Sequence, residues 1–194
     1  KQFVDAMSPA NFALTNPEVL QKTVESGGSN LLKGLEHLLE DLKAGRMKMT
    51  DESAFEVGRN VAITPGKVVF ENRLFQLIQY TPTTEKVFAT PLLIFPPWIN
   101  KFYILDLTAE KSFIRWAVEQ GLTVFVTSWK NADASLADVT LDHYVGEGQL
   151  TALDVVLDIC GTDSAHTIGY CVAGTTLAST LAVLAARGEA AKVA

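Results

Sequence analysis

The 194-residue sequence has little of several features that would place a protein in a specialised class. It has only two cysteines and no secretory segment at its start, which indicates a reducing cytoplasm rather than a disulfide framework. No apolar run approaches the roughly 18 residues that a membrane span needs, so any association with a surface would be peripheral. The formal net charge of −6 argues against a general nucleic-acid-binding surface, although a small basic patch could still receive an anionic ligand.

The first sixty residues have the pattern of a helical region. Asn16 and Pro17 form a helix start signal, a polar cap followed by a proline at the first helical position. The helix that follows is interrupted by glycines at 27 and 28, and Gly45 terminates it. Its apolar stripe has three- and four-residue spacing, and we expect it to pack on its own domain rather than on a partner; its members are Leu31, Leu32, Leu35, Leu38, Leu39 and Leu42.

Beyond Thr64 the periodicity becomes that of a sheet. The stretch KVVFENRLFQLIQY predicts two strands around a turn at residues 71–73. LLIF and LTVFVTSW predict two more that are buried on both faces, and HTIGYC predicts a fifth. Helical patterns at 109–120, 142–160 and 174–187 separate or follow the last strands. An antiparallel hairpin that leads into alternating strands and helices predicts a mostly parallel α/β sheet with helices on both faces.

Cys171 lies at the carboxyl end of the last of these strands, where such sheets bind their ligands. The stretch Gly-X-Cys-X-Ala is close to the strand-turn-helix elbow Gly-X-Ser-X-Gly. In that elbow, small residues leave room for a sharp turn with a strained backbone. The helix dipole and the N–H of Val172 would favour a thiolate there, which is the reactive species. Small residues around a buried core cysteine are also common, and that alternative stays open on the motif alone.

A second loop bears on the same site. In folds with such an elbow, the loop after LLIF supplies an N–H to the oxyanion hole, and Pro96-Pro97-Trp98-Ile99-Asn100 is a stiff segment at that position. Because prolines lack donors, the amide of Trp98, Ile99 or Asn100 is the candidate second donor beside Val172. A proline-stiffened connection with Trp98 in the core is the alternative.

The stretches LLIFPPWINKFYILDL, FIRWAVEQGLTVFVTSWKNAD and GYCVAGTTLASTLAVLAARGE resemble the class I polyhydroxyalkanoate (poly-3-hydroxybutyrate) synthases. The resemblance covers nearly the whole chain, and PPWINKFYILDL and SWKNAD are more specific than the elbow. Two positions depart from the family pattern: Ala173 replaces a usual glycine, and His143 stands where an acidic residue is usual. A methyl group at 173 is tolerable if the torsion angles of the turn stay negative.

The resemblance implies an α/β-hydrolase-like catalytic domain from residue 64 to 194, incomplete in this chain, after an N-terminal helical region at 1–63. It implies a polyester synthase in which Cys171 is the acyl-carrying nucleophile. The acyl donor would be a 3-hydroxyacyl-CoA, with CoA as the leaving group, no tightly bound cofactor and no metal. It also implies a homodimer in the cytoplasm, associated with polymer granules and phasin-type proteins. Preference for short or medium acyl chains cannot be inferred from these residues.

The chemistry of acyl transfer favours sulfur, because exchange between two thiols keeps the acyl group as a reactive thioester. It also needs a general base. His166 lies at the other end of its strand, about 16 Å from Cys171, and His37 belongs to the leucine-striped helix. His143 opens a helix, where the dipole disfavours its protonated form. The fold would place the catalytic Asp and His after residue 194. We therefore expect these 194 residues to be the amino-terminal part of a larger catalytic unit and inactive alone.

Other polar residues have weaker assignments. Cys160 is expected to be a core thiol. Asp106 and Asn131 are expected either to order the loops at the sheet edge or to be solvated caps. The cations nearest the expected mouth of the site, where CoA phosphates would bind, are Lys101, Lys130 and Arg115. A thioesterase or hydrolase of the same fold, and a non-catalytic granule-binding subunit, remain the alternative functions.

Overall fold

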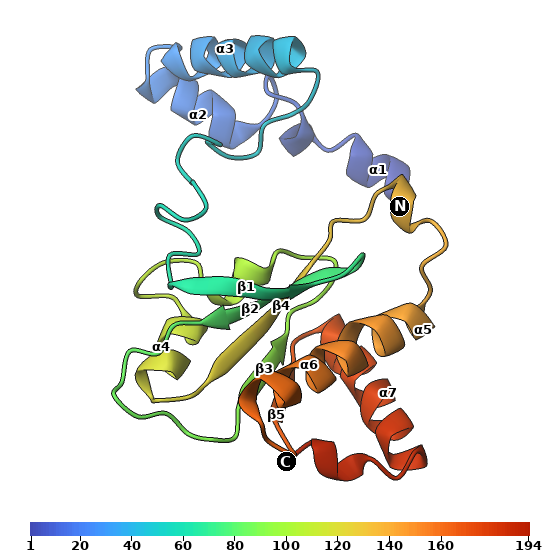
Figure 1. The fold of residues 1–194 in the computed structure, drawn as a ribbon. Helices are drawn as coiled ribbons and strands as arrows, with labels where there is room; N and C mark the ends of the chain where they lie inside the picture. The colour runs from blue at the N-terminus through green and yellow to red at the C-terminus, as the bar shows by residue number, and fades with distance from the viewer. The chain divides into compact units, whose positions relative to one another are not determined.

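The computed structural model describes all of residues 1–194 (Figure 1). The chain divides into two compact units, residues 1–54 and residues 55–194, and each is described by itself. The division falls before the boundary predicted at residues 63 and 64, because residues 55–63 belong to the sheet unit. There the N–H of Ala62 donates to the carbonyl of Asp106 at 2.9 Å, and the Thr64 hydroxyl donates to its carboxylate at 2.7 Å.

The N-terminal unit consists of helices, as predicted. The Asn16 side chain accepts hydrogen bonds from the amides of Glu18 and Val19, which satisfies two of the donors that every helix start leaves free. Gly45 closes the last helix with a φ of 66°, a left-handed conformation that suits glycine. The elements are α1 (Gln2–Ala6), η1 (Pro9–Asn11), α2 (Pro17–Glu25) and α3 (Ser29–Ala44).

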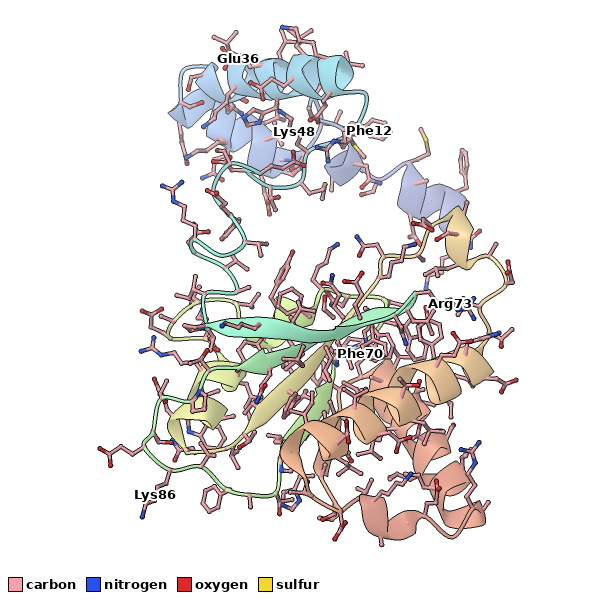
Figure 2. All side chains as sticks on the ribbon, viewed as in Figure 1. Phe12, Glu36, Lys48, Phe70, Arg73 and Lys86 are labelled. Carbon is pink, nitrogen blue, oxygen red and sulfur yellow. The ribbon has the colours of Figure 1, made fainter.

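The leucine stripe of α3 does not pack on its own domain, and that prediction is wrong. No residue of the N-terminal unit is buried, and the six leucines are between 43% and 68% exposed. The side chains of this unit, including Glu36, are drawn in Figure 2. The N-terminal unit brings together too little apolar surface to cover a stripe of this width, because a small unit buries only a small share of its surface.

The second unit is built on a five-stranded sheet, and all five predicted strands are present. The strand order is β1-β2-β4-β3-β5. β1 pairs with β2 and β2 with β4 in antiparallel fashion, whereas β3 is parallel to both β4 and β5. The strands are β1 (Gly66–Glu71), β2 (Phe75–Tyr80), β3 (Leu92–Phe95), β4 (Val124–Trp129) and β5 (His166–Gly169).

Helices cover both faces of this sheet, as predicted (Figure 1). Leu93 and Phe95 of β3 pack in the core cluster that includes α6 and α7, whereas Leu92 and Ile94 pack in the cluster that includes α4. This alternation follows from the two-residue period of a strand. The helices are α4 (Phe113–Glu119), α5 (Leu141–His143), the π-helical segment η4 (Tyr144–Leu150), α6 (Thr151–Cys160) and α7 (Val172–Ala186), with short 3₁₀ turns η2 (Phe102–Leu105), η3 (Ala134–Leu136) and η5 (Ala190–Lys192).

The outer side of β5 carries the beginning of a further parallel pairing. The N–H of Ala165 donates to the Lys192 carbonyl at 3.0 Å, and the N–H of Ala194 donates to the Ala165 carbonyl at 3.1 Å. Helix α7 is the crossover between β5 and this paired segment, as parallel neighbours require. Among the helices, none combines the length and the apolar character that crossing a bilayer requires.

Candidate functional site

Cys171 occupies a strained turn between β5 and α7. Its φ of 55° and ψ of −128° lie in a region that residues with a side chain rarely adopt, and its thiol belongs to an exposed residue. The turn is closed by hydrogen bonds from the N–H of Ala173 to the Tyr170 carbonyl at 3.1 Å and from the N–H of Gly174 to the Cys171 carbonyl at 2.9 Å. The alternative of a core cysteine sealed in apolar packing does not describe this thiol.

The strand and the helix cross at a distance that only glycine permits. A Cβ atom built on Gly169 would lie 2.8 Å from the Ala173 carbonyl oxygen and 2.8 Å from the Cα of Gly174. Ala173 itself is fully buried and does not have a positive φ, so its methyl group is accommodated without backbone strain. The small residues around Cys171 therefore serve this close crossing.

The loop after β3 leaves the sheet beside the elbow. Phe95 is the register partner of Gly169, and the N–H of Tyr170 donates to the Phe95 carbonyl at 3.1 Å. The N–H of Asn100 donates to the Pro97 carbonyl at 3.0 Å, so this amide is already engaged in a turn of the loop. No hydrogen bond is found for the amides of Trp98, Ile99 and Val172, so Trp98 and Ile99 both remain candidates for the second donor.

Two tryptophans fix the loop after β3. The Trp129 indole at the end of β4 donates to the Pro96 carbonyl at 2.7 Å in a buried hydrogen bond. Trp98 is half-buried and stacks on Tyr144 with ring centroids 4.7 Å apart, and Tyr144 meets Trp129 edge-on at 5.5 Å. These contacts hold the stretches PPWINK and SWKNAD, which neighbouring strands carry, against each other.

A hollow of about 500 Å³ opens between these two loops. Trp98, Leu136, Val139 and Tyr144 give it apolar walls, and Lys101 adds a cation. The Lys101 ammonium donates to the Asn131 side chain at 2.8 Å, which agrees with the prediction that Asn131 orders the loops. The hollow lies at the carboxyl ends of the strands, where α/β sheets bind ligands; Cys171 is not among its lining residues.

The other predicted cations lie apart from this hollow. Lys130 donates to Ser135 at 2.6 Å within its own loop, and Arg115 pairs with Glu119 along α4 at 2.8 Å. Asp106 is 1% exposed, and its carboxylate accepts the hydroxyl groups of Thr64 and Ser112. Asp106 therefore orders the segment before β1, as the prediction of a loop-ordering role implied.

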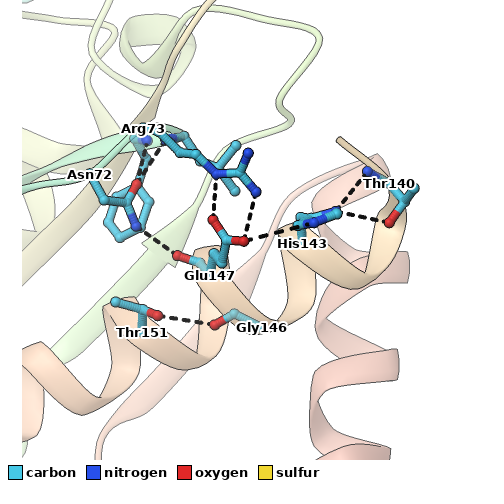
Figure 3. Close-up of polar contacts among 9 residues, drawn as sticks. Asn72, Arg73, Thr140, His143, Gly146, Glu147 and Thr151 are labelled. Atoms are coloured by element: carbon cyan, nitrogen blue, oxygen red, sulfur yellow. Dashed lines mark hydrogen bonds and ion pairs between the residues drawn. The ribbon is translucent and has the colours of Figure 1, made fainter. Parts of the chain in front are cut away.

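None of the three histidines contacts Cys171. His166 is exposed at the start of β5, the end of the strand opposite to the elbow, and His37 is exposed on α3. The Nδ1 of His143 accepts the N–H of Thr140 at 3.0 Å, so this ring caps a helix start, and its Nε2 lies 3.8 Å from Glu147 (Figure 3). In this unit His143 therefore has a structural role.

Glu147 is the centre of a polar cluster that the sequence did not reveal. Arg73 at the tip of the β1–β2 hairpin donates to both of its carboxylate oxygens, at 2.6 and 2.7 Å, and the Asn72 side chain donates to its carbonyl at 2.8 Å (Figure 3). The hydrogen bonds from Arg73 hold the pKa of the Glu147 carboxyl below its ordinary value. This clamp ties η4 to the hairpin, and no sequence signal linked residues 74 positions apart.

Gln149 is a second residue that the sequence analysis missed. It is fully buried, its amide donates to the Ala173 carbonyl at 3.2 Å, and its carbonyl accepts the Thr180 hydroxyl at 2.7 Å. Its one signal in the sequence was a polar residue inside an apolar helical run. Cys160 is half-buried against the core, and burial raises the pKa of its thiol, in keeping with a packed, unreactive residue.

No group of three or more His, Cys, Asp or Glu side chains is arranged to hold a metal ion. Chemically, the arrangement offers an exposed thiol on a fixed turn, with amides of Val172 and Ile99 that are not engaged.

Comparison with known proteins gives a consistent result. The chain is 57% identical over 188 residues to the poly(3-hydroxyalkanoate) polymerase subunit PhaC of Cupriavidus necator, and 53% identical over 193 residues to the poly(3-hydroxyalkanoate) polymerase of Methylorubrum extorquens. It is 51% identical over 193 residues to the corresponding PhaC subunit of Rhizobium meliloti. Each match covers 97% of this chain and 32% of the relative, so the chain spans about a third of the length of these relatives.

The family match rests on the helical region and the first part of the sheet unit. Residues 1–117 match the family described as poly-beta-hydroxybutyrate polymerase (PhaC) N-terminus. The match therefore includes α1 to α3, the first five residues of α4, the strands β1 to β3 and the PPWINK loop. The chain belongs to the poly-beta-hydroxybutyrate polymerase (PhaC) N-terminus family.

Proposed function

We propose that the chain is the nucleophile-bearing part of a polyester synthase, which transfers 3-hydroxyacyl groups from CoA thioesters to Cys171 and then to a growing polyhydroxyalkanoate chain. The observation that carries the proposal is the exposed cysteine with a φ of 55° at a strand-to-helix turn. The names of the relatives, which are polymerases of poly(3-hydroxyalkanoate), supply the substrate class.

The strand order supports an α/β-hydrolase-like fold for this unit. An antiparallel hairpin is followed by parallel strands, and the cysteine turn comes directly after β5. A nucleophile elbow of that fold stands on such a strand-to-helix turn, and its oxyanion hole takes one N–H from the residue after the nucleophile and one from the loop after the third strand. In this proposal Val172 supplies the first donor and Ile99 is the candidate for the second; the amides of both, like that of Trp98, make no other hydrogen bond.

The proposed reaction has two acyl transfers. The Cys171 sulfur, deprotonated by a base, attacks the thioester carbonyl carbon of the acyl-CoA, and the oxygen takes the negative charge beside the amides of Val172 and Ile99. The intermediate collapses with cleavage of the bond to the CoA sulfur, which leaves as a thiolate and takes the proton. A 3-hydroxyl oxygen then attacks the acyl-cysteine, loses its proton to a base, and expels the Cys171 sulfur as the ester bond forms.

The base and its acidic partner belong to other parts of the polypeptide in this proposal, because no histidine of residues 1–194 contacts the thiol. We further propose no tightly bound cofactor and a cytoplasmic homodimer at the granule surface with phasin-type partners. Asn100 is the weaker donor candidate, since Pro97 already engages its amide.

The test replaces Cys171 in a whole polymerase that contains these residues. We expect Cys171→Ala to abolish polymer formation and release of CoA, and Cys171→Ser to retain little activity, because an oxygen ester is a less reactive intermediate than a thioester. The assay follows CoA release with 3-hydroxybutyryl-CoA and the mass of polymer. Persistent polymer formation by Cys171→Ala would overturn the proposal. Release of free 3-hydroxy acid without polymer in the unaltered protein would indicate a thioesterase, and granule attachment without any turnover a binding subunit.

A further inference from the structure

The π-helical segment η4 touches both halves of the proposed site. Tyr144 at its first position stacks on Trp98 of the loop after β3, with ring centroids 4.7 Å apart. Gln149, five residues later, donates to the Ala173 carbonyl of the elbow. One short segment therefore contacts the loop that carries Ile99 and the turn that carries Cys171.

The π-helical geometry explains how these two side chains reach the same side. In an α-helix, residues five apart project about 140° from each other around the axis. A π-helix bonds residue i to residue i+5, so residues five apart lie about one turn apart and face the same way. The Thr151 hydroxyl adds a bond to the Gly146 carbonyl at 3.0 Å, also across five residues (Figure 3).

The acceptor of the Gln149 amide lies where strand and helix come closest. The Ala173 carbonyl oxygen is the atom that would lie 2.8 Å from a Cβ on Gly169, and the N–H of Ala173 closes the turn onto Tyr170. Gln149 is fully buried, and the Thr180 hydroxyl holds its other end at 2.7 Å. Its amide therefore fixes the first turn of α7, and with it the direction of the Val172 N–H.

The segment is in turn anchored from outside. Arg73 makes two hydrogen bonds to Glu147, and Asn72 makes one to the carbonyl of the same residue (Figure 3). Gly148 lies against Trp129, where an added Cβ would come within 3.0 Å of the indole ring. These contacts leave little freedom for η4 to shift relative to the sheet.

We propose that Gln149 is a positioning residue for acyl transfer, which acts through the Ala173 carbonyl to orient the elbow, while Tyr144 on the same π-helical segment orients the loop after β3. This inference rests on the proposed function of Cys171. It predicts that a change at Gln149 lowers kcat by more than a core change that destabilises the fold equally. The reason is that a misaligned oxyanion donor stabilises the transition state less.

The test uses the whole polymerase with Gln149→Met, which keeps the length of the side chain and removes both hydrogen bonds. We expect kcat to fall about tenfold, with KM for 3-hydroxybutyryl-CoA changed less than about twofold. The matched control is Ile114→Val, a mildly destabilising change in the core on the opposite face of the sheet. A fall in kcat no larger than that of the control at comparable thermal stability would overturn the inference.

A second variant isolates the hydrogen bond to Ala173. Gln149→Glu keeps the shape, and only the protonated carboxyl can donate to the Ala173 carbonyl. Because burial raises the pKa of a carboxyl group, we expect the kcat of this variant relative to the unaltered enzyme to rise as the pH falls, while the ratio for Gln149→Met stays flat. A flat ratio for Gln149→Glu as well would overturn the role of the donated hydrogen bond.

A third variant and the result for Cys171→Ala separate the positioning role from the proposed function. If Gln149→Met does not fold, Thr180→Val removes the hydroxyl that holds Gln149 and is expected to lower kcat about threefold; an unchanged kcat would then count against the inference. If Cys171→Ala is inactive while the Gln149 variants behave as the control, only the positioning role fails. If Cys171→Ala is active, the proposed function itself fails.

Discussion

The two units of the chain differ in whether their apolar side chains are buried. In residues 1–54, leucines at helical spacing form a stripe that stays at least 43% exposed, and the helices depend on local signals such as the Asn16 cap and Gly45. In residues 55–194, apolar residues of strands and helices from distant parts of the chain form two buried clusters. The difference shows that a helical pattern specifies which face is apolar, whereas burial requires a second surface to cover it.

The largest expected difference between the two units is in the free energy of unfolding lost when one apolar side chain of each is truncated to alanine. Phe125→Ala removes a fully buried ring and should lower the free energy of unfolding by about 3 to 5 kcal/mol. Leu35→Ala removes a side chain that is 51% exposed and should change it by less than about 0.5 kcal/mol. Urea unfolding followed by tryptophan fluorescence reports the first change, since all three tryptophans lie beyond residue 54, and circular dichroism reports the second. A large loss from Leu35→Ala would mean that the stripe is covered in solution.

Glycine-to-alanine changes at one chosen position in each unit should change the stability of the protein in opposite directions. Gly169→Ala places a methyl group 2.8 Å from the Ala173 carbonyl and should destabilise by about 1 to 3 kcal/mol. Gly34 lies within α3, and a Cβ atom added there would have no atom within 4 Å. Gly34→Ala should therefore stabilise that helix by up to about 1 kcal/mol. Gly146→Ala, also in open space but in the sheet unit, is the matched control. Thermal unfolding measures all three, and a neutral Gly169→Ala would contradict the close crossing at the elbow.

The smallest expected effect concerns the clamp on η4. Because Arg73 lowers the pKa of Glu147 in the folded protein, the pair stabilises the fold above the ordinary glutamate pKa, and this contribution is lost as the pH falls through the lowered value. Both side chains are nearly half exposed, so Glu147→Gln should lower the melting temperature at pH 7 by less than about 2 °C.

The pH dependence separates this clamp from an ordinary surface ion pair. The difference in melting temperature between the unaltered chain and Glu147→Gln should disappear toward acid pH. Thermal unfolding measured over a series of pH values checks this. Glu52→Gln, in the Arg46–Glu52 pair of the N-terminal unit, is the comparison, and it should have no measurable effect at any pH. A difference for Glu147→Gln that stays constant down to acid pH would contradict the role of its charge.

The sequence by itself determined the local elements and the place of the cysteine. The cap at Asn16, the stop at Gly45 and the five strands follow from patterns within a few residues, because capping and side-chain alternation are local properties. The glycine-flanked Cys171 after the fifth strand was recognisable for the same reason, since a strained turn between strand and helix needs small neighbours in sequence.

Only the tertiary structure decided which surfaces meet. It left the leucine stripe uncovered, engaged the Asn100 amide with Pro97, and brought Arg73 to Glu147 and Gln149 to Ala173. The contacts of Arg73 and Gln149 join residues from separate elements, and their partners depend on how the sheet and the helices pack. Helical periodicity also does not distinguish an α-turn from a π-turn, so the segment that joins the two halves of the proposed site could be seen only in the folded chain.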